Sequence, residues 1–512
     1  MEEKNQGRGA WSDRSVGRIT AHGLFIILMM SAVVGFMCGA AQAQHVLQYH
    51  LTADRLGNYL IPNLTPTLAH LMHLDRTFDG RVNGHVYAQP LLTPAAGHEL
   101  LLVATENNVI DALDADSGKL IWQRSLALAL PPVPLSMLPC GDINPLGITG
   151  TPVIDQSRGG IYFDAMGLTQ AGPQHLVFGL SVANGQTLPG FPVNVQQALT
   201  ALGMHFTPAD QNQRGALLIM KNTLYIPYGG LWGDCGSYHG WVVGIGLDKP
   251  HPVNAWQTQA SGGGIWARGG IVSDGQSLFV ATGNTFGASH WEDGEAVIRL
   301  GVDLKPPASI IDYFAPSDWQ TLDARDWDLG GTNPISFNLG TSHLMLALGK
   351  DTMAHLLDRD NLGGIGGALA VKKVSTEPIL TAPAAYPGPS GDTFVAFNAL
   401  GSNCPGGVPD PSLIVLKVLA QPAPTISTAW CGTLNGAGAP IVTTTDGKAN
   451  PIVWMVGAEG DNQLHAFRGD NGEPLLTGAQ PTMQGLRHFV TIVATQEHLY
   501  VPADGRIYAF TQ

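Results

Sequence analysis

Short runs of apolar residues recur along the chain, and turns rich in Gly, Asn and Asp separate them. The clearest unit has apolar runs at residues 90–92, 101–105, 109–113 and 120–122, with a tight turn at 114–119. Runs this short, bounded by turn residues, predict β-strands rather than helices. The unit is therefore interpreted as a sheet of four antiparallel strands.

The same order of strands and turns returns in degraded form to the end of the chain. Its turns follow at intervals of about 50 to 70 residues, at Asp116, Ala183, Asp248, Leu304, Asp360, Leu419 and Asp470. Repeated units of this kind predict an all-β fold, a β-propeller of seven or eight four-stranded antiparallel blades. An irregular pair of β-sandwiches is the competing fold, and the regular return of one strand order favours the propeller.

The ends of the chain are expected to close this ring, with residues 45–85 sharing a blade with the last strands. No linker rich in Pro and Ser and no long helical period interrupts the series. Residues 44–512 are therefore predicted to form one domain.

The composition fits this fold and excludes other classes of protein. The chain contains 64 Gly and 35 Pro, which suit many tight turns. Its net charge is −14, so the basic surface that nucleic-acid binding requires is not expected. Hydrophobic residues make up 44% of the chain, which argues against disorder.

Residues 1–43 have the three parts of an export signal. Basic residues come first, an apolar stretch spans residues 23–41, and Ala41-Gln42-Ala43 follows as a small-x-small cleavage site. The apolar stretch is also near the minimum length for crossing a bilayer, so a retained membrane anchor is the alternative. We expect a periplasmic or secreted bacterial protein, cleaved after Ala43.

Four cysteines follow this segment, namely Cys140, Cys235, Cys404 and Cys431. In an exported chain they permit two disulfides, and the sequence leaves all three connectivities open. The chain has no C-x-x-C-H motif and no C-x-x-C motif, so neither a c-type haem nor a structural zinc site is expected.

Two stretches resemble a known family, the quinoprotein propellers built from PQQ repeats. The turn and strand from Asp114 to Trp122 resemble the tryptophan-docking motif of that family. Residues 349–351 and 356–364 are similar to secreted bacterial PQQ-repeat proteins. The pattern covers nearly all of residues 87–512. We expect the Trp of each unit to pack between neighbouring blades, with its N–H bonded to backbone.

Three further segments resemble the cofactor site of PQQ-dependent alcohol dehydrogenases, in the same order and at similar spacings. The first carries Trp266 and Asn284, the second spans residues 326–333, and the third spans residues 349–351. The resemblance implies that Trp266 is the floor beneath PQQ and Asn284 a ligand of Ca²⁺. It also implies that Asp328 is the catalytic base.

The residue types suit these roles. The flat face of an indole can stack beneath a planar quinone, and Ca²⁺ prefers oxygen ligands such as those of Asn284 and Asp328. The ion would polarise the quinone carbonyl, while Asp328 accepts the proton of the substrate hydroxyl. Lys350 would neutralise the charge that develops on the reduced oxygens.

The chain departs from the family pattern at three positions. Cys235 stands where the calcium-binding Glu is expected, so the neighbouring Asp234 becomes the third candidate metal ligand. Cys140 is alone where the family has two adjacent cysteines, and Pro145 replaces an Arg that contacts the quinone.

Each candidate residue also has a purely structural interpretation. Asn284 suits a turn, Trp266 suits blade packing, Asp328 suits a loop cap, and Lys350 suits a solvated turn. His70 and His73 form an H-x-x-H pair, and the apolar residues around it favour an amphipathic segment of the first blade over a metal site.

Two functions follow. In the first, the propeller holds PQQ and Ca²⁺, oxidises an alcohol or sugar, and passes electrons to a separate acceptor. In the second, it is a non-catalytic scaffold that binds a protein or glycan. Convergence of the candidate residues on one axial cavity would favour the enzyme, and their dispersal would favour the scaffold.

Overall fold

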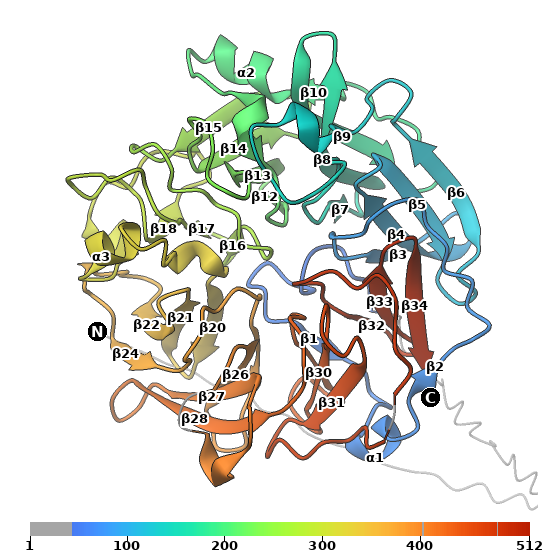
Figure 1. The fold of residues 1–512 in the computed structure, drawn as a ribbon, viewed down its shortest axis with the longest axis vertical. Coiled ribbons are helices and arrows are strands. Elements are labelled where there is room, and N and C mark those ends of the chain that lie inside the picture. The colour runs from blue at the N-terminus through green and yellow to red at the C-terminus, as the bar shows by residue number, and fades with distance from the viewer. Residues whose placement is uncertain (1–43, 402–403, 479) are drawn as a thin grey trace, which may run out of the picture. The chain divides into compact units, whose positions relative to one another are not determined.

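The computed structural model describes residues 44–401, 404–478 and 480–512, so the predicted export signal lies outside the described residues. The strands form eight sheets arranged in a ring (Figure 1). The predicted propeller is confirmed, with eight blades. The first strand of each blade lies toward the centre of the ring (Figure 1).

The first four blades follow the chain in order. Blade 1 contains β3 (Leu91–Ala95), β4 (His98–Thr105), β5 (Val109–Asp114) and β6 (Leu120–Ser125). Blade 2 contains β7 (Val153–Asp155), β8 (Gly160–Thr169), β9 (Gly172–Ser181) and β10 (Val193–Asn194). Blade 3 contains β11 (Gln211–Asn212), β12 (Leu218–Met220), β13 (Thr223–Gly230), β14 (Trp241–Gly246) and β15 (Val253–Gln257). Blade 4 contains β16 (Val272–Ser273), β17 (Leu278–Ala281), β18 (Val297–Leu300), β19 (Tyr313–Ala315) and β23 (Gly364–Ile365).

The last four blades complete the ring. Blade 5 contains β20 (Ile335–Leu339), β21 (Ser342–Leu348), β22 (Met353–Asp358) and β24 (Ala370–Lys373). Blade 6 contains β25 (Ala384–Pro387), β26 (Thr393–Asn398), β27 (Leu413–Leu419) and β28 (Thr425–Gly432). Blade 7 contains β1 (Asn58–Leu60), β29 (Ile441–Thr444), β30 (Ile452–Val456) and β31 (Leu464–Arg468). Blade 8 contains β32 (Val493–Ala494), β33 (Leu499–Ala503), β34 (Arg506–Thr511) and β2 (His73–Leu74).

Helices are short and lie in the connections between strands. They are α1 (Pro66–Ala69), α2 (Val195–Ala201) and α3 (Trp319–Asp323), with 3-10 turns at Leu135–Met137, Pro208–Asp210, Ile310–Asp312, Leu329–Gly331 and Pro405–Gly407. Within the described residues, no helix is long and apolar enough to cross a membrane.

Burial decreases from the middle of a blade to its outer edge. All residues of β14 and β30 are buried, because neighbouring blades cover both faces of these strands. The outermost strand β6 is almost wholly exposed. The middle strands therefore appear in the sequence as continuous apolar runs, which made them easy to recognise.

Tryptophans pack one blade against the next at two of the predicted turns. The indole N–H of Trp122 in blade 1 donates to the backbone O of Val182 at 3.0 Å, and that of Trp430 in blade 6 donates to the backbone O of Gly469 at 2.9 Å. A Cβ at Gly472 would lie 2.5 Å from Cε3 of Trp430, so this turn needs a glycine to admit the ring.

The two ends of the chain close the ring, as expected. β2 pairs in antiparallel register with β34, so the N-terminal region supplies the outer strand of blade 8. The same region also supplies β1, which pairs in parallel with β29. His70 is the C-cap of α1 and His73 lies in β2, so the H-x-x-H pair belongs to a segment that joins blade 8 rather than the first blade.

Residues 46–57, here called the axial segment, run past the inner edge of all eight blades. The segment contacts each blade through at least one hydrogen bond, and most of these bonds join backbone groups. From blade 1 to blade 8 the contacts are Val46–Leu92, Leu47–Ile154, Arg55–Leu217, Ala53–Ser273, Asp54–Ser336, Leu56–Ala385, Gly57–Val442 and His50–Thr491. One short segment thus ties together the inner strands of the ring.

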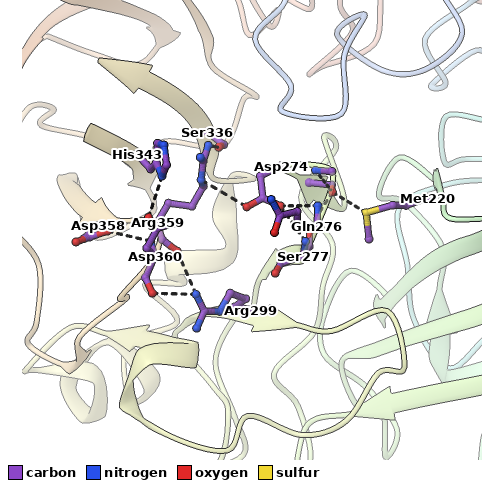
Figure 2. A network of polar contacts seen from close by, with 12 residues as sticks. Met220, Asp274, Gln276, Ser277, Arg299, Ser336, His343, Asp358, Arg359 and Asp360 are labelled. Carbon is purple, nitrogen blue, oxygen red and sulfur yellow. Dashed lines mark hydrogen bonds and ion pairs between the residues drawn. The ribbon is translucent and has the colours of Figure 1, made fainter. Parts of the chain in front are cut away.

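Polar side chains join blade 4 to blade 5 (Figure 2). Arg359 follows β22 of blade 5, and its Nε lies 3.6 Å from Oδ2 of Asp274, which follows β16 of blade 4. Within blade 5, Arg359 Nη1 also donates to Ser336 Oγ at 2.9 Å. Arg299 Nη1 donates to the backbone O of Asp360 at 3.0 Å. These contacts add directional bonds to the apolar packing between the two blades.

Two disulfides cross-link loops of the described residues. Cys140 is bonded to Cys235, 95 residues away, and Cys404 is bonded to Cys431, 27 residues away. Such bonds persist in oxidising compartments, in agreement with the expected export.

Candidate functional site

A cavity of about 210 Å³ opens among the connections of blades 3, 4 and 5. Its lining comprises Arg214, Gly230, Leu231, Trp232, Gly233, Asp234, Trp266, Asp326, Asp328 and Lys350. Four of the five predicted site residues are in this lining, although they are spread over more than 100 residues of sequence, from Asp234 to Lys350. We call this cavity the candidate pocket.

The loops that carry these residues lie at corresponding ends of three blades. Asp234 follows β13, Trp266 precedes β16, Asp328 precedes β20, and Lys350 follows β21. The connections into β16 and β20 therefore meet the β13–β14 and β21–β22 turns. The propeller brings these distant residues together because its blades repeat one loop arrangement around a common axis.

Lys350 and Asp328 form a largely buried ion pair in the lining of the pocket. Lys350 Nζ lies 2.5 Å from Asp328 Oδ2 and 2.9 Å from Asp326 Oδ1. The other oxygen of Asp328, Oδ1, accepts a hydrogen bond from the backbone N–H of Asn284 at 2.7 Å. Both oxygens of this carboxylate, which is 1% exposed, thus have a partner.

Burial and charge act in opposite directions on this pair. Burial raises the pKa of Asp328 to about 6, and the charge of Lys350 limits the rise. Burial by itself would lower the pKa of Lys350, but the carboxylates of Asp328 and Asp326 raise it above its usual value. Asp328 therefore titrates close to neutral pH, in the range useful to a general base, while Lys350 stays charged.

Trp266 presents its ring to the same space. Lys350 Nζ stands 5.2 Å from the ring centroid of Trp266, within the range of a cation–π contact. A Cβ at Gly283 would lie 2.7 Å from Asp328 Oδ1 and 3.2 Å from Trp266 Nε1, so a glycine is needed where these two side chains meet.

Asp234 forms part of the pocket wall. Its Oδ1 accepts a hydrogen bond from the Tyr238 hydroxyl at 2.6 Å, and burial together with the Asp234 charge raises the pKa of Tyr238. The next residue is Cys235, whose disulfide to Cys140 fastens this loop to the connection between blades 1 and 2. The wall is thus held from two sides.

Asn284 reaches the site through its backbone rather than through its side chain. Its N–H donates to Asp328, and its carbonyl O accepts from the N–H of Gly263 at 2.6 Å. The residue is not part of the pocket lining. The structure thus brings Asn284 next to Asp328 but does not present its amide oxygen to the pocket.

Sequence reasoning missed two charged residues of the site. Arg214 lines the pocket, and Glu295 is fully buried behind it with Oε2 accepting from the N–H of Leu329 at 2.6 Å. Burial and the nearby Asp328 charge raise the pKa of Glu295 well above its usual value. The sequence did offer a signal for Glu295, since this residue directly precedes the apolar run 296–298 and was therefore a candidate for burial. Acidic side chains are rarely fully buried without a role.

The residues fit a planar anionic group better than they fit a metal ion. Trp266 offers a half-buried ring, and Lys350 and Arg214 offer positive charge. By contrast, both Asp328 oxygens are engaged, Asp234 binds Tyr238, and Asn284 contributes an N–H donor. Among the described residues no group of three or more His, Cys, Asp and Glu side chains is arranged to hold a metal ion. As arranged, these donors do not form a cation site.

No protein-family model and no curated protein sequence matches this chain. Solved structures do match it. The quinohemoprotein alcohol dehydrogenase from Comamonas testosteroni is 13% identical, with a TM-score of 0.63 over 91% of this chain and 80% of that chain. A europium-containing methanol dehydrogenase is 12% identical, with a TM-score of 0.61 over 92% and 98%. BamB from Moraxella catarrhalis is 12% identical, with a TM-score of 0.48. At these identities the similarity to the two dehydrogenases is one of fold.

Proposed function

We propose that the candidate pocket is the catalytic site of an exported quinoprotein dehydrogenase that oxidises an alcohol or a sugar. The observation that carries the proposal is the convergence of Trp266, Asp328 and Lys350, with Asp234, on one pocket. The sequence resemblance selected these residues independently of any structure. Asn284, the fifth residue that it selected, meets the site only through its backbone.

In this proposal Trp266, Lys350 and Arg214 hold PQQ, Trp266 by stacking and the two cations by charge. Bound PQQ would supply an o-quinone that accepts the two electrons released when an alcohol becomes a carbonyl. Asp328 accepts the hydroxyl proton of the substrate on an oxygen now shared with Lys350. Lys350 keeps Asp328 ionised near neutral pH and stabilises negative charge that develops beside it.

The role of Ca²⁺ at Asn284, Asp234 and Asp328 remains a prediction, and no step above depends on it. In the described arrangement the Lys350 ammonium is the cation nearest Asp328, at 2.5 Å. Electrons would leave to a separate acceptor, since the chain carries no c-type haem motif.

The proposal is tested by titrating PQQ into the purified protein with and without Ca²⁺, following tryptophan fluorescence. We expect saturable quenching in the wild type, and binding at least about tenfold weaker in Lys350→Met, because a charged contact is lost. Lys305→Met is the matched control, since Lys305 is 80% exposed and pairs with Asp303 rather than lining the pocket.

Turnover is then measured with an artificial electron-accepting dye and a panel of alcohols and sugars. Asp328→Asn should bind PQQ but lose at least about a hundredfold in rate, as expected of a lost general base. Ca²⁺-dependent binding that Asn284→Ala abolishes would support the metal prediction. No quenching at high micromolar PQQ would overturn the quinoprotein proposal.

A non-catalytic scaffold that binds a protein or glycan is the second candidate function. Trp232, which lines the pocket, is 60% exposed, and Trp327, which lies in sequence between the lining residues Asp326 and Asp328, is 40% exposed. Exposed indoles suit stacking against a sugar ring or a partner side chain. Binding of oligosaccharides that Trp232→Ala abolishes, without any dye reduction, would favour this function.

A further inference from the structure

Another cavity, of about 540 Å³, lies beside the inner strands of blades 4 to 7, and we call it the second cavity. Residues 52–54 and Leu56 of the axial segment form part of its wall. Blade 4 contributes Asp274, blade 5 contributes residues 336–338 and Arg359, and blades 6 and 7 complete the wall. Among the described residues, none lines both this cavity and the candidate pocket.

The second cavity and the candidate pocket lie at opposite ends of the same strands. Lys350 of the candidate pocket precedes β22, whereas Arg359 of the second cavity follows it. Asp328 likewise precedes β20, whereas Asn338 lies near the far end of that strand. The six residues of β22 span roughly 20 Å in an extended strand. A ligand in the second cavity would therefore not touch the candidate pocket.

Arg359 is fixed in this wall but keeps one nitrogen free. Its Nη1 donates to Ser336 Oγ at 2.9 Å, and its Nε faces Asp274 Oδ2 at 3.6 Å, within the network that joins blades 4 and 5 (Figure 2). The side chain is 11% exposed. Its third nitrogen, Nη2, donates to no described residue and is not buried. Arg359 thus presents one free donor in a fixed position.

Asp274 keeps one carboxylate oxygen open to the second cavity. Its Oδ1 accepts hydrogen bonds from the N–H groups of Gln276 and Ser277 at 2.9 and 2.8 Å, which fixes the orientation of the carboxylate. Its Oδ2 accepts no hydrogen bond from a described residue, since the Nε of Arg359 stands 3.6 Å away, and this oxygen is not buried. Oδ2 can therefore accept from a ligand.

Asp54 of the axial segment supplies a second carboxylate. Its Oδ1 accepts from the Thr52 hydroxyl, and the backbone N–H of Leu56 also bonds to the carboxylate. These bonds oppose the effect of burial, which raises the pKa of Asp54. An ionised carboxylate can accept about four hydrogen bonds, so Asp54 retains capacity for a ligand hydroxyl.

The charges around the second cavity favour a neutral ligand. The charged side chains of its lining are two carboxylates, Asp54 and Asp274, and one guanidinium, Arg359. Two neighbouring cations are engaged elsewhere, since Arg55 donates to three backbone oxygens at 3.0 to 3.1 Å and Lys448 lines a different cavity with two carboxylates. An anion would meet an excess of negative charge, and a cation would meet Arg359.

The rest of the lining combines polar groups with carbon surface. Asn338 is exposed in β20, and its amide, which can donate and accept, forms no hydrogen bond to another described residue. Ala53, Leu56, Phe337 and Pro387 supply apolar surface beside it. A sugar has the matching chemistry, because its hydroxyls both donate and accept while its C–H groups pack on apolar side chains.

We propose that the second cavity binds a neutral sugar of one or two rings. Arg359 Nη2 donates to one of its hydroxyls, and the carboxylates of Asp54 and Asp274 accept from others. The volume of the cavity, about 540 Å³, lies within the range of about 300 to 1,000 Å³ that is usual for small-molecule sites. This site is separate from the proposed PQQ site, and its occupation requires no catalysis.

Calorimetric titration with glucose, galactose, maltose and lactose, in the absence of PQQ, tests the proposal. We expect saturable binding of at least one of these sugars to the wild type. Binding should be at least about tenfold weaker in Asp54→Asn, which loses a charged acceptor. It should disappear in Asn338→Trp, because the indole would fill the cavity. Val371→Trp is the matched control, since Val371 is 52% exposed on β24 of the same blade and does not line the cavity.

Further arms separate this site from the candidate pocket and from a charged ligand. Trp232→Ala, in the candidate pocket, should leave sugar binding unchanged, and urea unfolding should show that the two cavity variants are folded. The proposal would be overturned if none of the four sugars bound, or if binding survived both Asp54→Asn and Asn338→Trp. It would also be overturned if Trp232→Ala abolished binding, or if glucuronate or glucosamine bound more tightly than glucose.

Discussion

Asp328 is the residue whose chemistry depends most on its surroundings. It is almost completely buried, yet it keeps an ammonium on one oxygen and a backbone N–H on the other. Burial outweighs these contacts and leaves its pKa raised to about 6. The side chain is thus held ready to exchange a proton near neutral pH.

The raised pKa predicts how stability changes with pH. The folded protein binds the Asp328 proton more tightly than the unfolded chain, whose ordinary pKa is 3.8. The free energy of unfolding should therefore fall as pH rises from about 4 to about 6, by up to about 3 kcal/mol from this group. Asp328→Asn has no proton to lose and should not show this fall. Urea unfolding at several pH values would measure it, and parallel curves for the two proteins would contradict the prediction.

The residue types of the pocket were foreseeable, but their contacts were not. Trp266, Asp328, Lys350 and Asp234 were found from motif order and spacing, which survive at low sequence identity. The use of the Asn284 backbone instead of its amide depends on the local path of the chain, which no motif specifies. Arg214 belongs to no recognised motif. It reaches the pocket only because the folded ring brings its loop beside the other lining residues.

The strands are the elements that the sequence predicted best, because the middle strands of each blade are buried on both faces and are therefore continuously apolar. The predicted bond from the Trp N–H to backbone is present at Trp122 and Trp430. It is wrong at Trp256, whose buried Nε1 has no hydrogen-bond partner among the described residues. The short strands β1 and β23 were missed. Each consists of two or three residues and pairs in parallel, so its partner is far away in the sequence.

The packing of Trp430 on a glycine turn predicts a cost for adding one methyl group. Gly472→Ala would place a Cβ 2.5 Å from the indole, at a φ of +78°. Gly505→Ala shares a positive φ, +71°, but would meet no atom within 4 Å. We expect the first variant to be less stable than the second by about 1 to 3 kcal/mol, the cost of overpacking. Equal denaturant midpoints would show that the indole moves aside freely.

At the scale of the whole molecule, the two disulfides should contribute unequally. The Cys140–Cys235 bond closes a loop of 95 residues and the Cys404–Cys431 bond one of 27. Loop-closure entropy predicts a larger loss for the first pair, with both losses at about 2 to 4 kcal/mol. Guanidinium unfolding of the two double Cys→Ser variants would measure this. A larger loss for the shorter loop would contradict the entropic account.

The closure of the ring was predicted in outline from the two ends of the chain, and the β2–β34 pair confirms it. The disulfide connectivity was left open because it depends on which loops the ring brings together. Cys140 and Cys235 become neighbours only after blades 1 to 3 have assembled in order. Contacts of this kind belong to the complete propeller rather than to any one repeat.

The axial segment also fits one particular number of blades. Within twelve positions its residues form hydrogen bonds to all eight blades, although not in blade order. A ninth repeat gained by duplication would find no group on this segment to bond, and a lost repeat would leave one of its groups without a partner. Families of repeat proteins change length easily when each unit contacts only its neighbours. Here twelve residues at the start of the fold bond to every repeat. A change in the number of repeats would therefore require a matching change in the axial segment.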